Sequence, residues 1–268
     1  MEFRELGRSG EKVSVIGMGT WKIGVFNSAE ERAEQVRALR RGLDLGINLI
    51  DTAEMYASGR SEEVVAEAVK GRRDDAFIAT KVSPENLRRD AVIAACDRSL
   101  KRLGVSTIDL YQVHWPNPSV PIKETMSAME ELVAQGKVRH VGVSNFGVDL
   151  MEAARESMSK SDIVSDQVEY SLKSRGAESE VLPYCRREKL TLIAYTPIAR
   201  GNVRSMGFPE SLLAEHHMTP IQAALSWVVR DEQVVAIPKA ASIPHLEEDA
   251  ASASMKLTQS EYRMIEGA

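Results

Sequence analysis

The sequence predicts a single (β/α)8 barrel, and two observations support that prediction. Eight short runs rich in apolar and β-branched residues recur along the chain, and amphipathic segments with helical spacing separate them. Continuous apolar strands that alternate with helices indicate a parallel sheet buried on both faces. Eight such units in 268 residues favour a closed barrel over an open sheet, because this barrel takes about 250 residues. We therefore expect one domain over residues 1–268.

The expected elements begin with a hairpin outside the barrel. The segment EFRELGRSGEKVSVI predicts two short strands that turn at Ser9 and Gly10 and cover the bottom of the barrel. The barrel strands are expected in eight runs: SVIGMGTW at 14–21, NLIDTA at 48–53, AFIATKV at 76–82, IDLYQVHW at 108–115, VRHVGVSNF at 138–146, VSDQVEY at 164–170, LTLIAYTP at 190–197 and VVAIPKA at 234–240.

The segments between the strands carry signals for helix starts and ends. Ser28 with Glu31 predicts a capping box, and Gly46 stands where a left-handed C-cap would fall. Ser61 is expected to cap a second helix, with two glutamates near the positive end of that helix. Two further helices are expected from the spacing of apolar residues over 124–135 and 219–230.

Composition excludes several classes of protein. The formal charge of −5 argues against a nucleic-acid partner, which calls for a basic face. No apolar run approaches the roughly 20 residues of a membrane span, and MEFRELGRSG lacks the apolar stretch of a signal peptide. Cys96 and Cys185 both fall in helix-like segments, so we expect reduced thiols and a cytoplasmic protein.

Polar side chains end nearly every expected strand. The chemistry of such barrels sits at the C-terminal ends of the strands, so these side chains should share one rim. The residues at these ends are Asp51, Lys81, His114, Ser144, Asn145, Gln167, Tyr195 and Lys239.

Three of these residues come from adjacent strands and suggest a reaction. Asp51 is the natural partner of Lys81, and the pair would keep Lys81 charged despite burial. A charged Lys81 beside Tyr56 would lower the pKa of that phenol, which makes Tyr56 a general acid for a developing alkoxide. His114 would donate a hydrogen bond to the same oxygen. This chemistry suits carbonyl reduction, with the hydride supplied from elsewhere.

Each of these residues also has a structural interpretation. A strand-end ion pair is often only structural, a lone histidine beside Trp115 is often a wall residue, and a loop tyrosine needs no function. The combination of all four at one rim favours catalysis.

Two segments resemble other functional motifs but lack a residue that each motif requires. GMGTWK at 17–22 has Lys22 where a dinucleotide fingerprint needs a third glycine, and GVSNF at 142–146 has Phe146 where a nucleophile elbow needs glycine. The pair His216 and His217 has no matching zinc motif and is expected at the surface. We therefore expect no metal.

Seven ordered motifs resemble those of the aldo-keto reductase family over essentially the whole chain. They are GMGTW at 17–21, DTAEMY at 51–56, TKV at 80–82, DLYQVHWP at 109–116, VRHVGVSNF at 138–146, AYTPIARG at 194–201 and AIPKAAS at 236–242.

The resemblance implies a catalytic tetrad of Asp51, Tyr56, Lys81 and His114, in agreement with the residue-level interpretation. It also implies a nicotinamide dinucleotide bound across the top of the barrel as the hydride source. The substrate mouth would be formed by Trp21, Tyr56, His114 and Trp115. The implied cofactor contacts are Gly19, Thr20, Trp21, Asp51, Ser144, Asn145, Gln167, Tyr195, Thr196, Pro197, Ile198, Arg200, Gly201, Lys239, Ser242, His245, Glu248 and Asp249.

The last strand bears on the choice of cofactor. By resemblance, Lys239 would pair with the 2′-phosphate of NADP, and Glu248 fits the usual acid. His245 stands where an arginine often reinforces that phosphate, and the loss of its bidentate contact weakens phosphate recognition. Asp249 stands where an asparagine often reads adenine, and it adds repulsion if it lies close. Ser242 contacts the phosphate or merely starts the next helix. NADPH is the expected cofactor, and dual use with NADH stays open.

The expected function is reversible, NADPH-dependent reduction of aldehydes or ketones, with a small carbonyl or alcohol compound as the partner. The alternative is a cofactor-binding sensor or partner subunit of the same fold with negligible turnover. A broken tetrad would favour that alternative, and the tetrad is complete. Short loops predict an open pocket. The physiological substrate, the direction of the reaction and the oligomeric state do not follow from the sequence.

Overall fold

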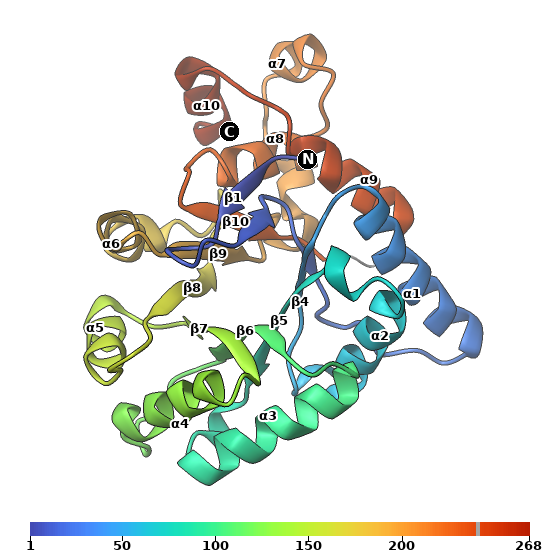
Figure 1. Ribbon diagram of the computed structural model, residues 1–268. Coiled ribbons are helices and arrows are strands. Elements are labelled where there is room, and N and C mark those ends of the chain that lie inside the picture. Colours follow the sequence, from blue (N-terminus) through green and yellow to red (C-terminus); the bar gives the residue numbers. More distant parts are fainter. Residues whose placement is uncertain (240–241) are drawn as a thin grey trace.

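The computed structural model describes residues 1–239 and 242–268, and Figure 1 shows strands enclosed by a ring of helices. The eight barrel strands pair in parallel, each with the next along the chain. Parallel bridges from Ile16 to Ala236 and from Gly19 to Lys239 join the first strand to the last and close the barrel. The strands are β3 (Met18–Gly19), β4 (Leu49–Asp51), β5 (Phe77–Val82), β6 (Ile108–Val113), β7 (Val138–Ser144), β8 (Ile163–Glu169), β9 (Thr191–Tyr195) and β10 (Val234–Ile237).

The predicted (β/α)8 fold is therefore confirmed. Each observed strand overlaps its predicted run, and residue 240 of the last run lies outside the described residues. The close approach of the first and last strands depends on Gly19, because a Cβ there would lie 2.7 Å from the carbonyl oxygen of Ile237.

The predicted hairpin is also confirmed. Strands β1 (Phe3–Glu5) and β2 (Lys12–Ser14) pair in an antiparallel manner. Leu6 and Val13 are fully buried and belong to the same apolar cluster as Phe77, which begins β5. The hairpin therefore covers the N-terminal end of the barrel, where the inner side chains would otherwise meet water.

Ten α-helices and five 3₁₀ turns connect the strands of the described chain. Among them, none has both the length and the apolar composition that crossing a bilayer requires. The helices are α1 (Ala29–Asp44), α2 (Arg60–Val69), α3 (Arg89–Leu103), α4 (Ile122–Ala134), α5 (Val148–Glu156), α6 (Val181–Glu188), α7 (Glu210–Glu215), α8 (Pro220–Val228), α9 (Ile243–Ser252) and α10 (Gln259–Glu266). The turns are η1 (Tyr56–Gly59), η2 (Arg73–Asp75), η3 (Pro84–Asn86), η4 (Gly176–Glu178) and η5 (Ala199–Ser205).

The signals around α1 are largely confirmed. The Ser28 side chain accepts a hydrogen bond from the Glu31 backbone, and Gly46 is left-handed with φ of 83°. The Glu31 carboxylate accepts a hydrogen bond from the backbone amide of Asn27 and not from that of Ser28. The second bond of a capping box is therefore replaced, and the predicted box is only half formed.

The expectation that Ser61 caps α2 is wrong. The chain turns left-handed at Gly59, with φ of 88°, so the helix already begins at the next residue. Ser61 therefore lies inside the first turn with the two expected glutamates, and its fully buried hydroxyl bonds to Thr20 Oγ1 at 2.8 Å and to Thr52 Oγ1 at 3.0 Å. It joins the loops that follow β3 and β4.

Both cysteines are free, as expected. Cys96 in α3 and Cys185 in α6 are fully buried, and burial raises the pKa of the Cys96 thiol to about 12. Both side chains therefore serve as small apolar groups in the core.

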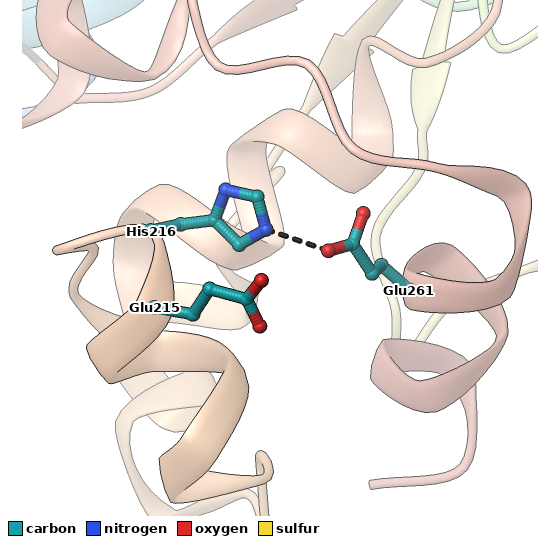
Figure 2. A group of neighbouring side chains, drawn as sticks. All are labelled: Glu215, His216 and Glu261. Atoms are coloured by element: carbon teal, nitrogen blue, oxygen red, sulfur yellow. Dashed lines mark hydrogen bonds and ion pairs between the residues drawn. The ribbon is translucent and has the colours of Figure 1, made fainter.

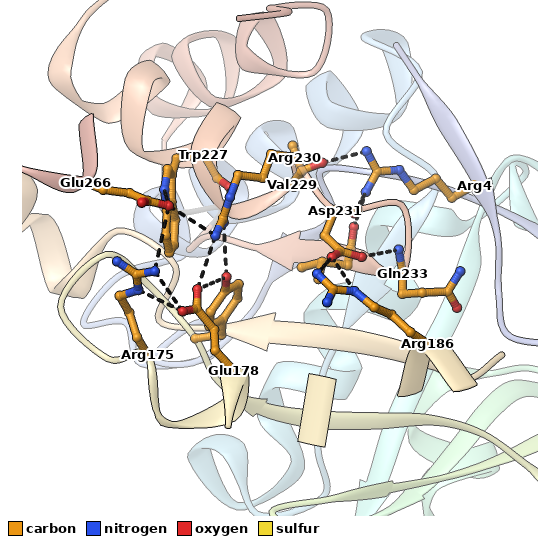
Figure 3. Close-up of polar contacts among 12 residues, drawn as sticks. Arg4, Arg175, Glu178, Arg186, Trp227, Val229, Arg230, Asp231, Gln233 and Glu266 are labelled. Atoms are coloured by element: carbon orange, nitrogen blue, oxygen red, sulfur yellow. Dashed lines mark hydrogen bonds and ion pairs between the residues drawn. The ribbon is translucent and has the colours of Figure 1, made fainter. Parts of the chain in front are cut away.

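A cluster of aromatic and charged side chains attaches the C-terminal helix to the barrel (Figure 3). Trp227 is fully buried, and its Nε1 donates to Glu266 of α10 at 2.9 Å. The Arg230 guanidinium lies 3.7 Å from the centre of the Trp227 ring. It also donates to the Tyr170 hydroxyl at 3.0 Å and to Glu178 at 3.1 Å. Arg230 also lies 3.4 Å from Glu266, so one cation links α10, η4 and the residue that follows β8.

We expect Arg230→Met to lower the free energy of unfolding by about 1–3 kcal/mol, because it removes a cation–π contact and several hydrogen bonds. Urea denaturation measures the effect. Arg37→Met is the matched control, since the Arg37 side chain is 59% exposed and its single ion pair within the described residues is with Glu34, at 3.9 Å. It should change stability by less than about 0.5 kcal/mol. Equal losses in the two variants would contradict the prediction.

Candidate active site

The rim is built around a buried ion pair. Lys81 Nζ donates to Asp51 Oδ1 at 2.7 Å, to Asp51 Oδ2 at 2.8 Å and to the Thr52 carbonyl at 2.8 Å. Lys81 is fully buried and Asp51 is 2% exposed, so all three ammonium hydrogens need these partners. The predicted pair is present. Burial lowers the pKa of Lys81, and the Asp51 carboxylate opposes that shift.

Gln167 completes the pair from across the barrel. Its Nε2 donates to Asp51 Oδ2 at 2.7 Å. The sequence did not indicate this contact, because β4 and β8 are far apart along the chain and no local pattern links them. The resemblance placed Gln167 only against the cofactor.

Tyr56 lies above this pair in a left-handed turn. Ala57 and Ser58 have φ of 48° and 57°, a conformation that costs residues other than glycine about 1–2 kcal/mol each. Lys81 Nζ lies 5.2 Å from the Tyr56 ring centre, and the His114 ring lies edge-on at 5.6 Å. The structure therefore brings the four predicted catalytic residues together.

The expectation that Lys81 lowers the pKa of Tyr56 is wrong for this structure. Burial raises the pKa of Tyr56, and the Asp51 carboxylate adds to the rise. Burial also lowers the pKa of His114 to about 3, with Lys81 adding to the fall. Both Tyr56 and His114 are thus neutral at physiological pH and can present a phenol and an imidazole to one oxygen atom.

A second set of hydrogen bonds continues along the rim. Ser144 Oγ donates to the Gln167 carbonyl at 2.8 Å, and Asn145 Nδ2 donates to the His114 carbonyl at 3.0 Å. The Tyr195 hydroxyl donates to Asn145 Oδ1 at 2.9 Å. The ends of β6, β7, β8 and β9 are therefore linked, and the Tyr195 ring is held in one orientation.

Exposed apolar side chains surround the site. Trp21 is 50% exposed, Met55 49% and Trp115 47%, and they follow β3, β4 and β6. Lys22 and Arg200 place their charges 4.8 and 6.0 Å from the Trp21 ring centre. The sequence indicated both tryptophans but not Met55, although an exposed methionine beside Tyr56 was a usable signal.

The loop after β9 is tied to α9. Residues 196 and 199–201 all have positive φ, so the loop turns tightly at the start of η5. Arg204 in η5 contacts Glu248 of α9 at 2.9 Å, and the second oxygen of Glu248 accepts from Thr219 at 2.7 Å. These two segments contain many of the positions implied for the cofactor.

The remaining positions lie at the start of α9 and after β10. Lys239 and His245 are exposed, and Ser242 is the N-cap residue of α9 without a capping side-chain bond. Asp249 is 3% exposed, and burial together with Glu248 raises its pKa to about 7. Motif residues 240 and 241 lie outside the described part of the chain.

The charges fit an anionic dinucleotide. Within residues 1–239 and 242–268, no carboxylate forms an ion pair with Lys22, Arg200 or Lys239. Buried His114 Nδ1 also has no partner among the described atoms. The rim therefore has cations for phosphate groups beside polar groups for a nicotinamide.

His217 is exposed, as expected, whereas His216 is half-buried. Figure 2 shows the His216 ring pointing toward Glu261. Its Nε2 lies 2.6 Å from Glu261 Oε1, and the other oxygen of Glu261 accepts from Thr258 to cap α10. With Glu215, this is the set of potential metal ligands that converges in the described chain. The contact joins the end of α7 to the start of α10, which gives it a structural role.

Comparisons with known proteins agree on one family. Residues 15–207 and 209–268 match the model described as the Aldo/keto reductase family. The chain is 40% identical over 258 residues to methylglyoxal reductase YeaE of Escherichia coli strain K12, which covers 94% of this chain and 90% of that protein.

Solved structures give the same result. An aldo-keto reductase from Klebsiella pneumoniae in complex with NADPH has a TM-score of 0.91 and 38% identity, covering 100% of this chain and 95% of that one. The thermostable aldo-keto reductase Tm1743 in complex with the inhibitor epalrestat has a TM-score of 0.91 and 38% identity, covering 100% of this chain and 99% of that one.

His114 should make stability depend on pH. An unfolded histidine titrates near 6.5, whereas the pKa of folded His114 is about 3. Between these pH values His114 is protonated in the unfolded chain but not in the folded chain. The free energy of unfolding therefore falls as the pH falls. We expect His114 to contribute a loss of about 3 kcal/mol between pH 6.5 and pH 4. Denaturant titrations at both pH values should show a smaller loss for His114→Gln than for wild type, and equal losses would contradict the assignment.

Proposed function

The chain belongs to the aldo/keto reductase family, and on that premise we propose that it reduces aldehydes or ketones with NADPH, using Tyr56 as the proton donor. The observation that carries the proposal is the buried Lys81–Asp51 pair beneath a neutral Tyr56 and a neutral His114. Family membership makes the protein an oxidoreductase. The solved relative from Klebsiella pneumoniae, in complex with NADPH, supports the choice of cofactor.

In this mechanism the bound cofactor supplies the hydride to the carbonyl carbon. His114 donates a hydrogen bond that orients the carbonyl oxygen. As negative charge develops there, Tyr56 transfers its proton and the alcohol forms. The Lys81 ammonium, 5.2 Å from the ring centre, stabilises the resulting phenolate until solvent returns the proton. The reverse sequence oxidises an alcohol.

The rim residues would hold the nicotinamide. We propose that Ser144, Asn145 and Gln167 contact its carboxamide and that the ring stacks on Tyr195. Because Gln167 Nε2 already donates to Asp51, its side-chain carbonyl oxygen is the atom offered to the carboxamide. Arg200 would lie beside the pyrophosphate, where its charge is favourable.

The proposed substrates are small aldehydes and dicarbonyl compounds. The mouth lined by Trp21, Met55 and Trp115 is apolar and exposed, which suits compact substrates that need few polar contacts. The relative named methylglyoxal reductase supports a dicarbonyl compound as the first substrate to test.

Tyr56→Phe should lower the rate of carbonyl reduction by about 10²–10⁴-fold, because it removes the proton donor. NADPH affinity should stay within about twofold, since the hydroxyl is proposed to act on the carbonyl oxygen alone. The decay of NADPH absorbance with methylglyoxal measures the rate, and NADPH fluorescence measures binding. Normal turnover in the variant would overturn the role of Tyr56. A flat absorbance trace for wild type with every carbonyl tested would favour the sensor.

Asp249 should make NADPH binding depend on pH. Its pKa is raised to about 7 by burial and by Glu248, against the opposing charge of Arg204. If Asp249 lies near the cofactor as the family resemblance implies, its ionisation above pH 7 repels the phosphate groups and raises the dissociation constant several-fold.

The 2′-phosphate itself titrates near 6, as phosphate monoesters do, so the informative comparison is between wild type and Asp249→Asn. Fluorescence titrations at pH 6 and pH 8 should give a larger rise in the dissociation constant for wild type than for the variant. The same pH response in both proteins would remove Asp249 from the cofactor site.

A further inference from the structure

A second carboxylate, that of Glu54, lies between two tetrad residues in the sequence and has no assigned role. Glu54 stands three residues after Asp51 and two before Tyr56. Its side chain is only 7% exposed, so it does not face the substrate mouth as its neighbour Met55 does. A buried carboxylate needs partners, and those of Glu54 come from the loop that follows β5.

The partners of Glu54 lie at the end of β5. Its Oε1 accepts from the Ser83 backbone at 2.8 Å and from Asn86 Nδ2 at 2.9 Å. Its own backbone amide donates to the Lys81 carbonyl at 3.3 Å. Glu54 is therefore hydrogen-bonded to the backbone on both sides of Val82, at Lys81 and Ser83. In the other direction, Lys81 Nζ donates to the Thr52 carbonyl in the loop after β4.

The other side of Tyr56 is strained. Ala57 and Ser58 both occupy the left-handed region, and Gly59 follows with φ of 88°. Such strain persists only where the surrounding structure holds the backbone in place. Relaxation of this strained turn would lower its conformational energy and would move Tyr56. The hydrogen bonds of Glu54, on the other side of Tyr56, oppose that movement.

The same contacts reach the loop of His114. Asn117, three residues after His114, donates from Nδ2 to the Pro84 carbonyl at 2.9 Å. Pro84 lies in η3, the turn whose Asn86 binds Glu54. Glu54, η3 and Asn117 therefore form one brace across the loops that follow β4, β5 and β6.

We propose that Glu54 is a positioning residue for the reduction, whose carboxylate holds the Tyr56 hydroxyl in register with Lys81 and His114. The proposal rests on the proposed function. Glu54 acts through its acceptor oxygen, because the charged partner on its other oxygen, Arg98, is 3.5 Å away and half-exposed. Misplacing a reacting group by about 1 Å can cost about 10²-fold in rate, so a modest relaxation of the loop is enough to be measured.

The test uses two variants at one position. Glu54→Met keeps the volume but removes the acceptor from Ser83 and Asn86, and Glu54→Gln keeps an acceptor oxygen. We expect Glu54→Met to lower the single-turnover rate with bound NADPH by at least about tenfold and to enlarge the solvent deuterium isotope effect, because proton transfer from Tyr56 becomes slower. Glu54→Gln should restore most of that rate. The NADPH dissociation constant should be unchanged in both.

Glu130→Met is the matched control. The Glu130 carboxylate likewise accepts hydrogen bonds from a loop backbone, at Ser159, Lys160 and Ser161. None of its hydrogen-bond partners in the described part of the chain lies in the tetrad loops. All proteins are assayed well below their unfolding temperatures, so loss of stability alone should not change the rate. Glu130→Met should therefore match wild type.

Two results would overturn the inference about Glu54 and leave the proposed function standing. One is a Glu54→Met rate within twofold of an active wild type, and the other is an equal loss in Glu130→Met. A wild type that oxidises no NADPH with any carbonyl overturns the proposed function, and this inference with it.

Discussion

An ammonium group that water cannot reach must be surrounded by acceptors, and this requirement organises the rim of the barrel. Lys81 is fully buried, and each of its hydrogens meets an oxygen of Asp51 or Thr52. Asp51 is then bound by Gln167 from the opposite side of the barrel. The ion pair therefore specifies how β4, β5 and β8 align at their ends, because a slip of one residue would leave a charge buried without a partner.

Neutrality of the groups above the pair follows from the same arrangement. Burial raises the pKa of Tyr56, the Asp51 carboxylate adds to the rise, and the phenol therefore keeps its proton. His114 is neutral because burial and the nearby ammonium both disfavour a second cation. A site built this way keeps the Tyr56 phenol protonated across the physiological range, which its proposed role as proton donor requires.

The barrel, the hairpin and the juxtaposition of the tetrad could be predicted because each depends on a pattern local in sequence: apolar runs, turn residues and the polar residue that ends a strand. The errors arose where three-dimensional surroundings override the local pattern. Ser61 looked like a cap, but the left-handed Gly59 starts the helix earlier. The pKa of Tyr56 depends on burial and on the nearby Asp51 carboxylate, which residue types alone do not reveal. Gln167 binds Asp51 across 116 residues of sequence and Glu54 binds Ser83 across 29, and no local signal marks either contact.

The closure of the barrel has a consequence for how the chain is made. The backbone of Val15 accepts from Ala236, and that of Gly17 donates to the same residue, so the first strand is bound to the last. The hairpin leaves the ribosome before the barrel strands do, and it has no complete surface to cover until β10 exists. Assembly of the native ring must therefore wait until β10 has been synthesised, and until then the apolar side chains of the hairpin need shielding from other nascent chains.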